Sequence, residues 1–157
     1  LAEELILGDA GYFHIDGLVV KKSVIEKSGY MDETLVLHQD SEFCVRAAAV
    51  SMLYPGRLDH PVAIRRVHDQ NRISSPRSQM KQFTDRMNYW ISLYRWAKSN
   101  LGKDKQELIL KSTIKFARTH KYFTNFPRSV FPTRLIWFTR SLRLLAYPEI
   151  LLDVIKK

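Results

Sequence analysis

The spacing of apolar residues predicts an amphipathic helix over residues 39–50. Glu42 and Arg46 lie four residues apart on one side of this helix, where opposite charges form an ion pair. Another side is apolar, because three residues recur at steps of three or four: Phe43, Ala47 and Val50. The helix therefore has one face to bury. Residues 29–38 before it are expected to form a glycine-containing turn and a loop.

This helix is expected to hold Asp40 in its first turn. A carboxylate near the N-terminus of a helix is favoured by the helix dipole and stays ionised more easily. Two interpretations follow from this position. Either Asp40 or Ser41 simply caps the helix, or Asp40 is a base in a reaction.

Strands are predicted on both sides of this helix. Three segments are rich in aromatic and β-branched residues or follow turn signals: residues 12–20, with Gly17 as a candidate bulge, residues 52–54, and residues 61–68, with Pro61 at the first position. Residues 22–28 are predicted to form a short helix with Ser23 as its cap and Gly29 as its end. Residues 1–7 form either the end of a helix or an edge strand.

From residue 79 onward the apolar period is helical. Four helices are predicted, over residues 79–100, 104–122, 128–146 and 149–157. The first has an apolar stripe formed by Phe83, Met87, Trp90 or Ile91, and Tyr94. The polar segment 69–79, which contains Pro76, separates these helices from the strands. The sequence therefore predicts two parts: an α/β domain over residues 1–75 and an all-α region over residues 76–157.

Charge divides the chain at the same place. Residues 1–75 hold 8 Lys and Arg against 11 Asp and Glu, a net charge of −3, whereas residues 76–157 hold 17 against 5, a net charge of +12. A basic region favours an anionic partner such as a membrane surface, a nucleic acid or a phosphorylated substrate. The alternative is a solvated basic face without a dedicated partner.

Composition narrows the class of protein. With 45% hydrophobic residues in 157, the chain can bury a core and is not of a disordered type. Cys44 is the only cysteine, so no internal disulfide forms, and its place in the apolar pattern indicates a core residue. No apolar run reaches the roughly 18–20 residues of a membrane-spanning helix. The chain begins with leucine, and we expect it to be a piece of a longer protein.

Three blocks then resemble a known family. In order they are residues 17–35 (GLVVKKSVIEKSGYMDETL), residues 39–46 (QDSEFCVR) and residues 54–74 (YPGRLDHPVAIRRVHDQNRIS). Together they are similar to the acceptor-side half of a family 2 glycosyltransferase, over about residues 10–75. The resemblance implies part of a GT-A fold, which is Rossmann-like and α/β. It also implies transfer of a sugar from a nucleotide diphosphate donor, with inversion, to a saccharide or lipid-linked acceptor.

The resemblance assigns roles to individual residues. Asp40 matches the second acid of the family's Glu-Asp pair and would be the general base. Gln39, at the place of the usual Glu, and His38 would contact substrate, although His38 is equally a plain loop residue. The segment that closes over the donor diphosphate would contain Arg65, Arg66 and Asn71. His68 would complete the shell of a divalent cation, Mg²⁺ or Mn²⁺, or else is a surface or packed residue.

Other parts of the expected enzyme are missing from the sequence. The family binds its donor through an Asp-x-Asp motif, and these 157 residues contain none. We therefore expect the chain to be inactive by itself and to belong to a cytoplasmic enzyme of cell-surface polysaccharide synthesis. Its helical region would then either lie on the inner face of an anionic membrane or pack against protein.

A different class of function remains open for the basic region. In this alternative the region is a non-catalytic module that binds nucleic acid or an anionic membrane. The residues expected at a membrane surface are Arg128, Arg134, Arg140, Arg143, Lys156 and Lys157, interleaved with Phe131, Trp137, Phe138 and Tyr147. The sequence contains no nucleic-acid-binding motif, and we expect no nucleic-acid partner.

Overall fold

A computed structural model describes residues 1–8, 14–57, 59–61, 63–64, 79–119 and 142–155. Its α-helices are α1 (Ala2–Leu7), α2 (Lys22–Ser28), α3 (Gln39–Val50), α4 (Gln79–Asn100), α5 (Lys103–Thr119) and α7 (Pro148–Ile155). Two short 3₁₀-helices complete the set: η1 (Ile15–Gly17) and η3 (Leu142–Ala146). Over these residues the fold is all-α.

The prediction of an α/β, Rossmann-like first half is therefore wrong. The described part of the chain contains no strand, and the described end of the predicted strand 12–20 is the 3₁₀-helix η1 followed by irregular backbone. Residues 52–54 and the described residues of 61–68 are irregular as well. Val19 is 99% exposed and Ile64 is 91% exposed. β-branched residues favour strands only where a neighbouring strand covers them, and among the described residues none does.

Most of the predicted helices are present. The helices over residues 22–28, 39–50 and 79–100 are confirmed with their predicted bounds. Helix α2 ends at Gly29 as expected, but its N-cap is Lys21, because Ser23 already lies inside the first turn. Helix α5 covers most of the predicted range 104–122. The predicted helix 128–146 falls mainly outside the described residues, and its described end forms η3.

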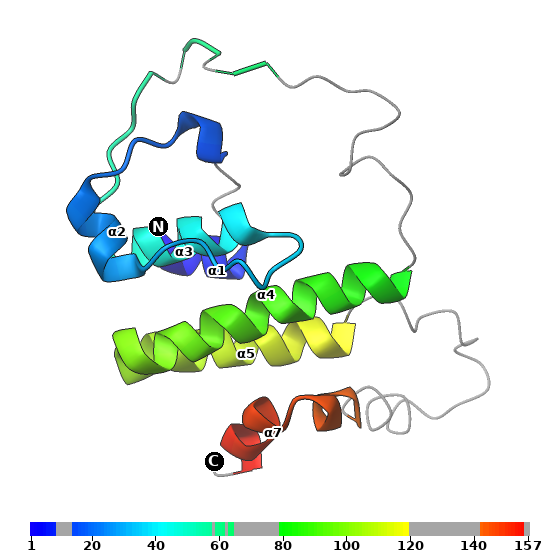
Figure 1. The fold of residues 1–157 in the computed structure, drawn as a ribbon. Coiled ribbons are helices and arrows are strands. Elements are labelled where there is room, and N and C mark those ends of the chain that lie inside the picture. The colour runs from blue at the N-terminus through cyan, green and yellow to red at the C-terminus, as the bar shows by residue number, and fades with distance from the viewer. Residues whose placement is uncertain (9–13, 58, 62, 65–78, 120–141, 156–157) are drawn as a thin grey trace.

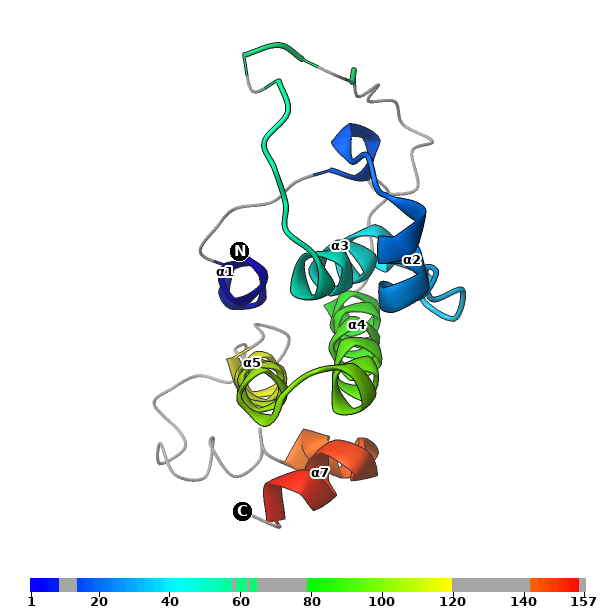
Figure 2. The ribbon, with the colours of Figure 1, turned by 90° about the vertical axis from the view of Figure 1, so that its left-hand side faces the viewer.

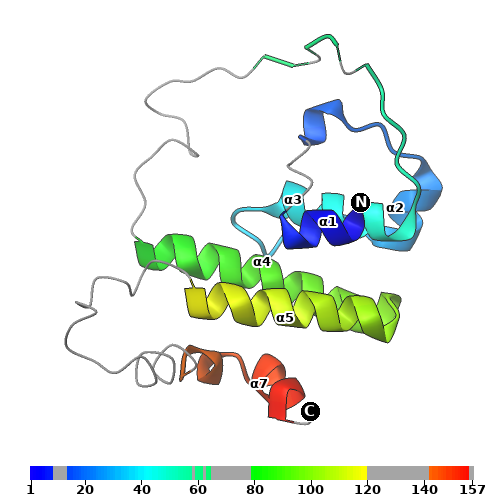
Figure 3. The ribbon, with the colours of Figure 1, turned by 180° about the vertical axis from the view of Figure 1, so that it is seen from behind.

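The helices are arranged in three layers around α4. Helices α1, α2 and α3 lie on one side of α4 and α5, and α7 lies on the other (Figures 1 and 2). Helix α1 runs beside α3 and also contacts α5, as the rear view shows (Figure 3). Helix α4 is thus covered on several sides. It must present apolar residues around most of its circumference rather than along one stripe.

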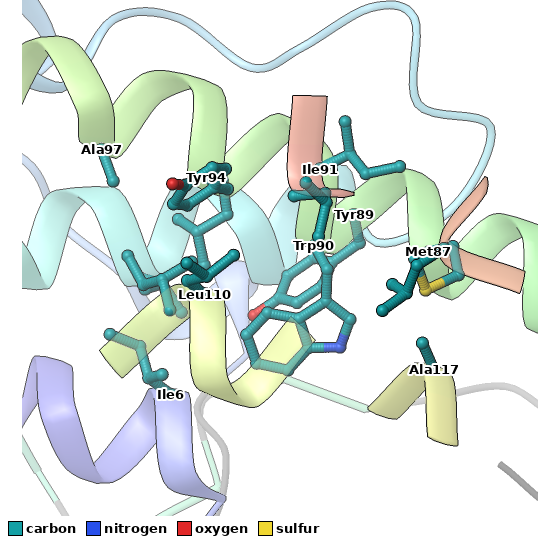
Figure 4. Packing of buried hydrophobic residues seen from close by; sticks show 14 of the residues in the cluster. Ile6, Met87, Tyr89, Trp90, Ile91, Tyr94, Ala97, Leu110 and Ala117 are labelled. Carbon is teal, nitrogen blue, oxygen red and sulfur yellow. The ribbon is translucent and has the colours of Figure 1, made fainter. Parts of the chain in front are cut away.

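One hydrophobic cluster joins the layers. Residues of α4 form its centre, including Met87, Trp90, Leu93 and Ala97, and Ile109 of α5 packs against them. Val45 of α3, Ile150 of α7 and Ile6 of α1 belong to the same cluster. Figure 4 shows Ile6 near residues of α4 and α5. The cluster therefore contains residues from both sides of the predicted division at residue 75. The segment in which that division was placed lies mostly outside the described residues.

Candidate active site

A buried ion pair anchors the segment that leads to Asp40. Arg46 and Glu42 are only 4% and 1% exposed, and the Nε and Nη2 atoms of Arg46 lie 2.8 and 2.7 Å from Oε2 of Glu42. Arg46 also donates from Nη1 to the carbonyl of Ser28 and from Nη2 to the carbonyl of Tyr30, the latter at 2.8 Å. The predicted pair exists, and it ties α3 to the end of α2.

Gly29 lies between these two carbonyls in a conformation that favours glycine. Its φ is 79° and its ψ is 168°, a region that residues with a Cβ rarely adopt. A Cβ placed on Gly29 would lie 3.2 Å from Nη1 of Arg46. The turn therefore needs glycine both for its backbone and for the close approach of the guanidinium group.

Replacing Gly29 by alanine is expected to lower the free energy of unfolding by roughly 1–3 kcal/mol, because the backbone becomes strained and Arg46 must move. Chemical denaturation followed by circular dichroism measures the loss. Gly56→Ala is the matched control, since a Cβ at Gly56 meets no atom within 4 Å. Equal losses in the two variants would contradict the assigned role of Gly29.

The loop after Gly29 is fixed by Asp32. Its Oδ1 accepts hydrogen bonds from the backbone N–H and the hydroxyl of Thr34, at 2.9 and 2.6 Å, and its Oδ2 accepts one from the Ser92 hydroxyl of α4 at 2.6 Å. Burial opposes the charge on Asp32, but these hydrogen bonds and the nearby Arg46 outweigh it, so the pKa of Asp32 is lowered. An ionised Asp32 thus holds the loop against α4.

Ser92 connects this loop to the buried ion pair. Its hydroxyl also lies 3.4 Å from Oε1 of Glu42. Burial raises the pKa of Glu42, and the contacts with Arg46 and Ser92 offset part of that rise while the charge of Asp32 adds to it. Two carboxylates, one guanidinium and one hydroxyl therefore form a continuous network between the loop, α3 and α4.

Asp40 lies where the sequence predicted, in the first turn of α3. Its side chain is half-buried, and Oδ1 accepts a hydrogen bond of 2.8 Å from the backbone N–H of Ser41. Neither Asp40 nor Ser41 is the N-cap, since that position belongs to His38. Gln39 donates from its amide to the carbonyl of Leu35. The carboxylate of Asp40 is thus positioned at a helix N-terminus while part of it still reaches the surface.

His38 has an unusual backbone and distinct neighbours. Its φ of 68° and ψ of 16° place it in the left-handed region, where residues other than glycine are uncommon. Its Nδ1 lies 3.4 Å from Nη1 of Arg86, and its ring packs edge-on against Tyr89 at 5.9 Å between centroids. The Arg86 guanidinium lies 4.6 Å from the centre of the Tyr89 ring. Burial raises the pKa of Tyr89 to about 12, so its hydroxyl stays protonated.

Arg86 and Tyr89 were not predicted as part of a site. Both belong to α4, which the sequence assigned to a separate region, and Tyr89 lies outside the predicted apolar stripe. They meet His38 because α4 packs on α3. Nothing in the sequence indicates that Arg86 and Tyr89 lie close to His38, which precedes them by about fifty residues.

The other predicted site residues cannot be placed beside Asp40. Arg65, Arg66, His68 and Asn71 lie outside the described residues. Among the residues that are described, no group of three or more His, Cys, Asp or Glu could hold a metal ion. The predicted divalent cation and its ligand His68 therefore stay a prediction, and no chemical step is assigned to the cation.

Cys44 is a core residue, as the sequence indicated. Its side chain is buried, and burial together with the charge of Asp40 raises the pKa of the thiol to about 11. The thiol is therefore protonated at neutral pH and is not a nucleophile.

None of the described helices combines the length and the apolar character needed to cross a membrane. Comparison with protein-family models, with curated proteins and with solved structures gives no significant match for this chain.

Proposed function

We propose that the chain is the acceptor-side part of an inverting glycosyltransferase of cell-surface polysaccharide synthesis, with Asp40 as the general base. The proposal rests on the three sequence blocks and on one observation. The partly exposed carboxylate of Asp40 occupies the first turn of α3, directly after the loop of residues 30–38, which we call the anchored loop because Arg46 and Asp32 hold it in place. It concerns the chemistry at Asp40 and does not depend on the α/β fold that the described residues lack.

The geometry supports a base at this position in three ways. The Ser41 N–H donates a hydrogen bond to the carboxylate, which holds it at the N-terminus of α3. Arg46 and Gly29 fix the turn where the loop begins, and Asp32 fixes its middle. His38 and Arg86 provide polar groups next to the same turn, and these would contact the hydroxyls of the acceptor sugar.

In the proposed reaction an acceptor hydroxyl donates a hydrogen bond to Asp40. The hydroxyl proton passes to the carboxylate as the oxygen attacks the anomeric carbon of the donor sugar. The bond from that carbon to the nucleotide diphosphate breaks, and the diphosphate leaves with the electron pair. Attack opposite the leaving group inverts the anomeric configuration. Because the sequence has no Asp-x-Asp motif, the proposal assigns donor binding to a part of the protein outside these residues.

Sugar transfer by an Asp40→Asn variant tests the proposal. We expect transfer to be lost while the nucleotide sugar still binds. Transfer at the unaltered rate would contradict the assignment of Asp40 as base.

A purely basic interaction module has less support from the described residues. Three cations of α4 and α5 pair with acids of the chain itself: Arg95 with Glu149 at 2.7 Å, Lys98 with Asp153 at 2.9 Å, and Lys111 with Glu107 at 3.1 Å. Most residues expected at a membrane surface fall outside the described part, and for them membrane binding stays a prediction.

A further inference from the structure

A pocket of about 330 Å³ opens between the anchored loop, helix α4 and the start of α7. The loop contributes Asp32, Thr34 and Leu35, and the region of α7 contributes Tyr147 and Glu149. Helix α4 forms the wall between them, with Asn88, Ser92 and Arg95 among its residues. This volume lies within the range of pockets that hold small ligands.

The lining is mainly polar and offers both donors and acceptors. Carboxylates of Asp32 and Glu149 accept hydrogen bonds, the guanidinium of Arg95 donates them, and the amide of Asn88 does both. Leu35, Ile91 and Ala146 add apolar groups to the lining. Tyr147 adds an aromatic ring, and burial raises the pKa of its hydroxyl, which therefore remains a neutral donor.

Charge limits the ligand that such a pocket accepts. Arg95 lies 2.7 Å from Glu149, so its positive charge is balanced within the wall. Asp32 then leaves the lining with a net negative charge, which disfavours phosphates and other anions. An apolar ligand would cover the charged groups of Asp32, Glu149 and Arg95 and take them out of contact with water, which is costly. The best match is a neutral ligand with many hydroxyls and an apolar C–H face.

We propose that this pocket binds a neutral saccharide unit. Asp32, Glu149 and Asn88 would accept or donate hydrogen bonds to sugar hydroxyls, and the ring of Tyr147 would pack on the C–H face. The proposal does not require Asp40 to be a base, because Asp40 is not among the lining residues.

The walls of the pocket are held in place before any ligand binds. Ser92 donates to Asp32 at 2.6 Å on the loop side. On the other side, Tyr94 and Lys98 each lie 2.9 Å from Oδ2 of Asp153 and fasten α7 to α4. A site formed in advance loses less conformational freedom on binding and so binds more tightly.

Titration of the chain with maltotriose, cellotriose and N-acetylchitotriose, followed by NMR, tests the proposal. At least one of these at millimolar concentration is expected to shift the amide signals of Ser92 and Tyr147. Asn88→Ala is expected to weaken that binding about 5- to 10-fold. The replaced side chain is exposed, so the core stays intact. Asn100→Ala is the matched control, because Asn100 is exposed on the same helix and does not line the pocket.

The proposal is overturned if none of the three saccharides shifts these signals, or if inorganic phosphate shifts them and the saccharides do not. It is also overturned if Asn88→Ala and Asn100→Ala bind equally well. Asp40→Asn is expected to bind the saccharide with unchanged affinity. A failure of the pocket proposal is thereby separated from a failure of Asp40 as base, which is measured by sugar transfer alone.

Discussion

Sugar transfer by the Asp40→Asn variant is expected to be about 10²- to 10⁴-fold slower than transfer by the unaltered protein, the usual contribution of a general base. Asparagine has nearly the same shape as aspartate, and its carbonyl oxygen can still accept the hydrogen bond from the Ser41 N–H. It cannot accept a proton from the acceptor hydroxyl. Initial rates of transfer, measured in the protein that includes the donor-binding part, give the size of the effect.

Two controls make this experiment specific. Loss of the charge at the helix N-terminus costs about 0.3–1 kcal/mol, so the variant is expected to remain folded and to bind the nucleotide sugar unchanged in calorimetry. Glu33→Gln removes an exposed charge from the loop that precedes the same helix and is expected to transfer at the unaltered rate. If the two variants slow transfer equally, a general loss of negative charge explains the result and Asp40 is not the base.

The helices of this chain could be predicted because their signals are local. Helix α4 has apolar residues at steps of three or four from Phe83 to Tyr94, and α2 ends at a glycine with positive φ. The absence of strands from the described residues could not be predicted, because a strand exists only where a second strand pairs with it, and residue type does not show that pairing. Val19 and Ile64 have the residue types of strands, yet both are almost fully exposed. Residue type alone therefore gave the wrong fold class.

The candidate site could be predicted only in part, for a related reason. The four-residue spacing of Glu42 and Arg46 is the same for a surface pair and for a buried pair, so it does not indicate that α3 turns this side inward. The partners that settle the question are carbonyls of Ser28 and Tyr30, which lie 18 and 16 residues before Arg46. The spacing Asp32-x-Thr34 is a local signal that could have revealed the loop turn, because Asp side chains often bond to the backbone two residues later.

Replacing Arg46 by alanine is expected to lower the free energy of unfolding by about 3–5 kcal/mol, the usual cost of breaking a buried ion pair. The variant leaves the carboxylate of Glu42 buried and without its main partner. It also leaves the Ser28 and Tyr30 carbonyls without the guanidinium that they bind. Since small domains are stable by only 5–15 kcal/mol, this is a large fraction of the total. Urea denaturation followed by tryptophan fluorescence measures it.

A surface pair with the same spacing is the matched control for Arg46. Lys22 and Glu26 also lie four residues apart, but their side chains are 89% and 62% exposed, and Lys22→Ala is expected to cost no more than about 0.5 kcal/mol. The double variant Glu42→Leu with Arg46→Met should recover part of the stability, because it removes both buried charges while filling the space. In the double variant the carbonyls of Ser28 and Tyr30 would still lack their hydrogen bonds from the Arg46 guanidinium. If Arg46→Ala and Lys22→Ala lower the free energy of unfolding equally, the Arg46 pair does not anchor the segment that leads to Asp40. The proposed position of the base then loses its physical support.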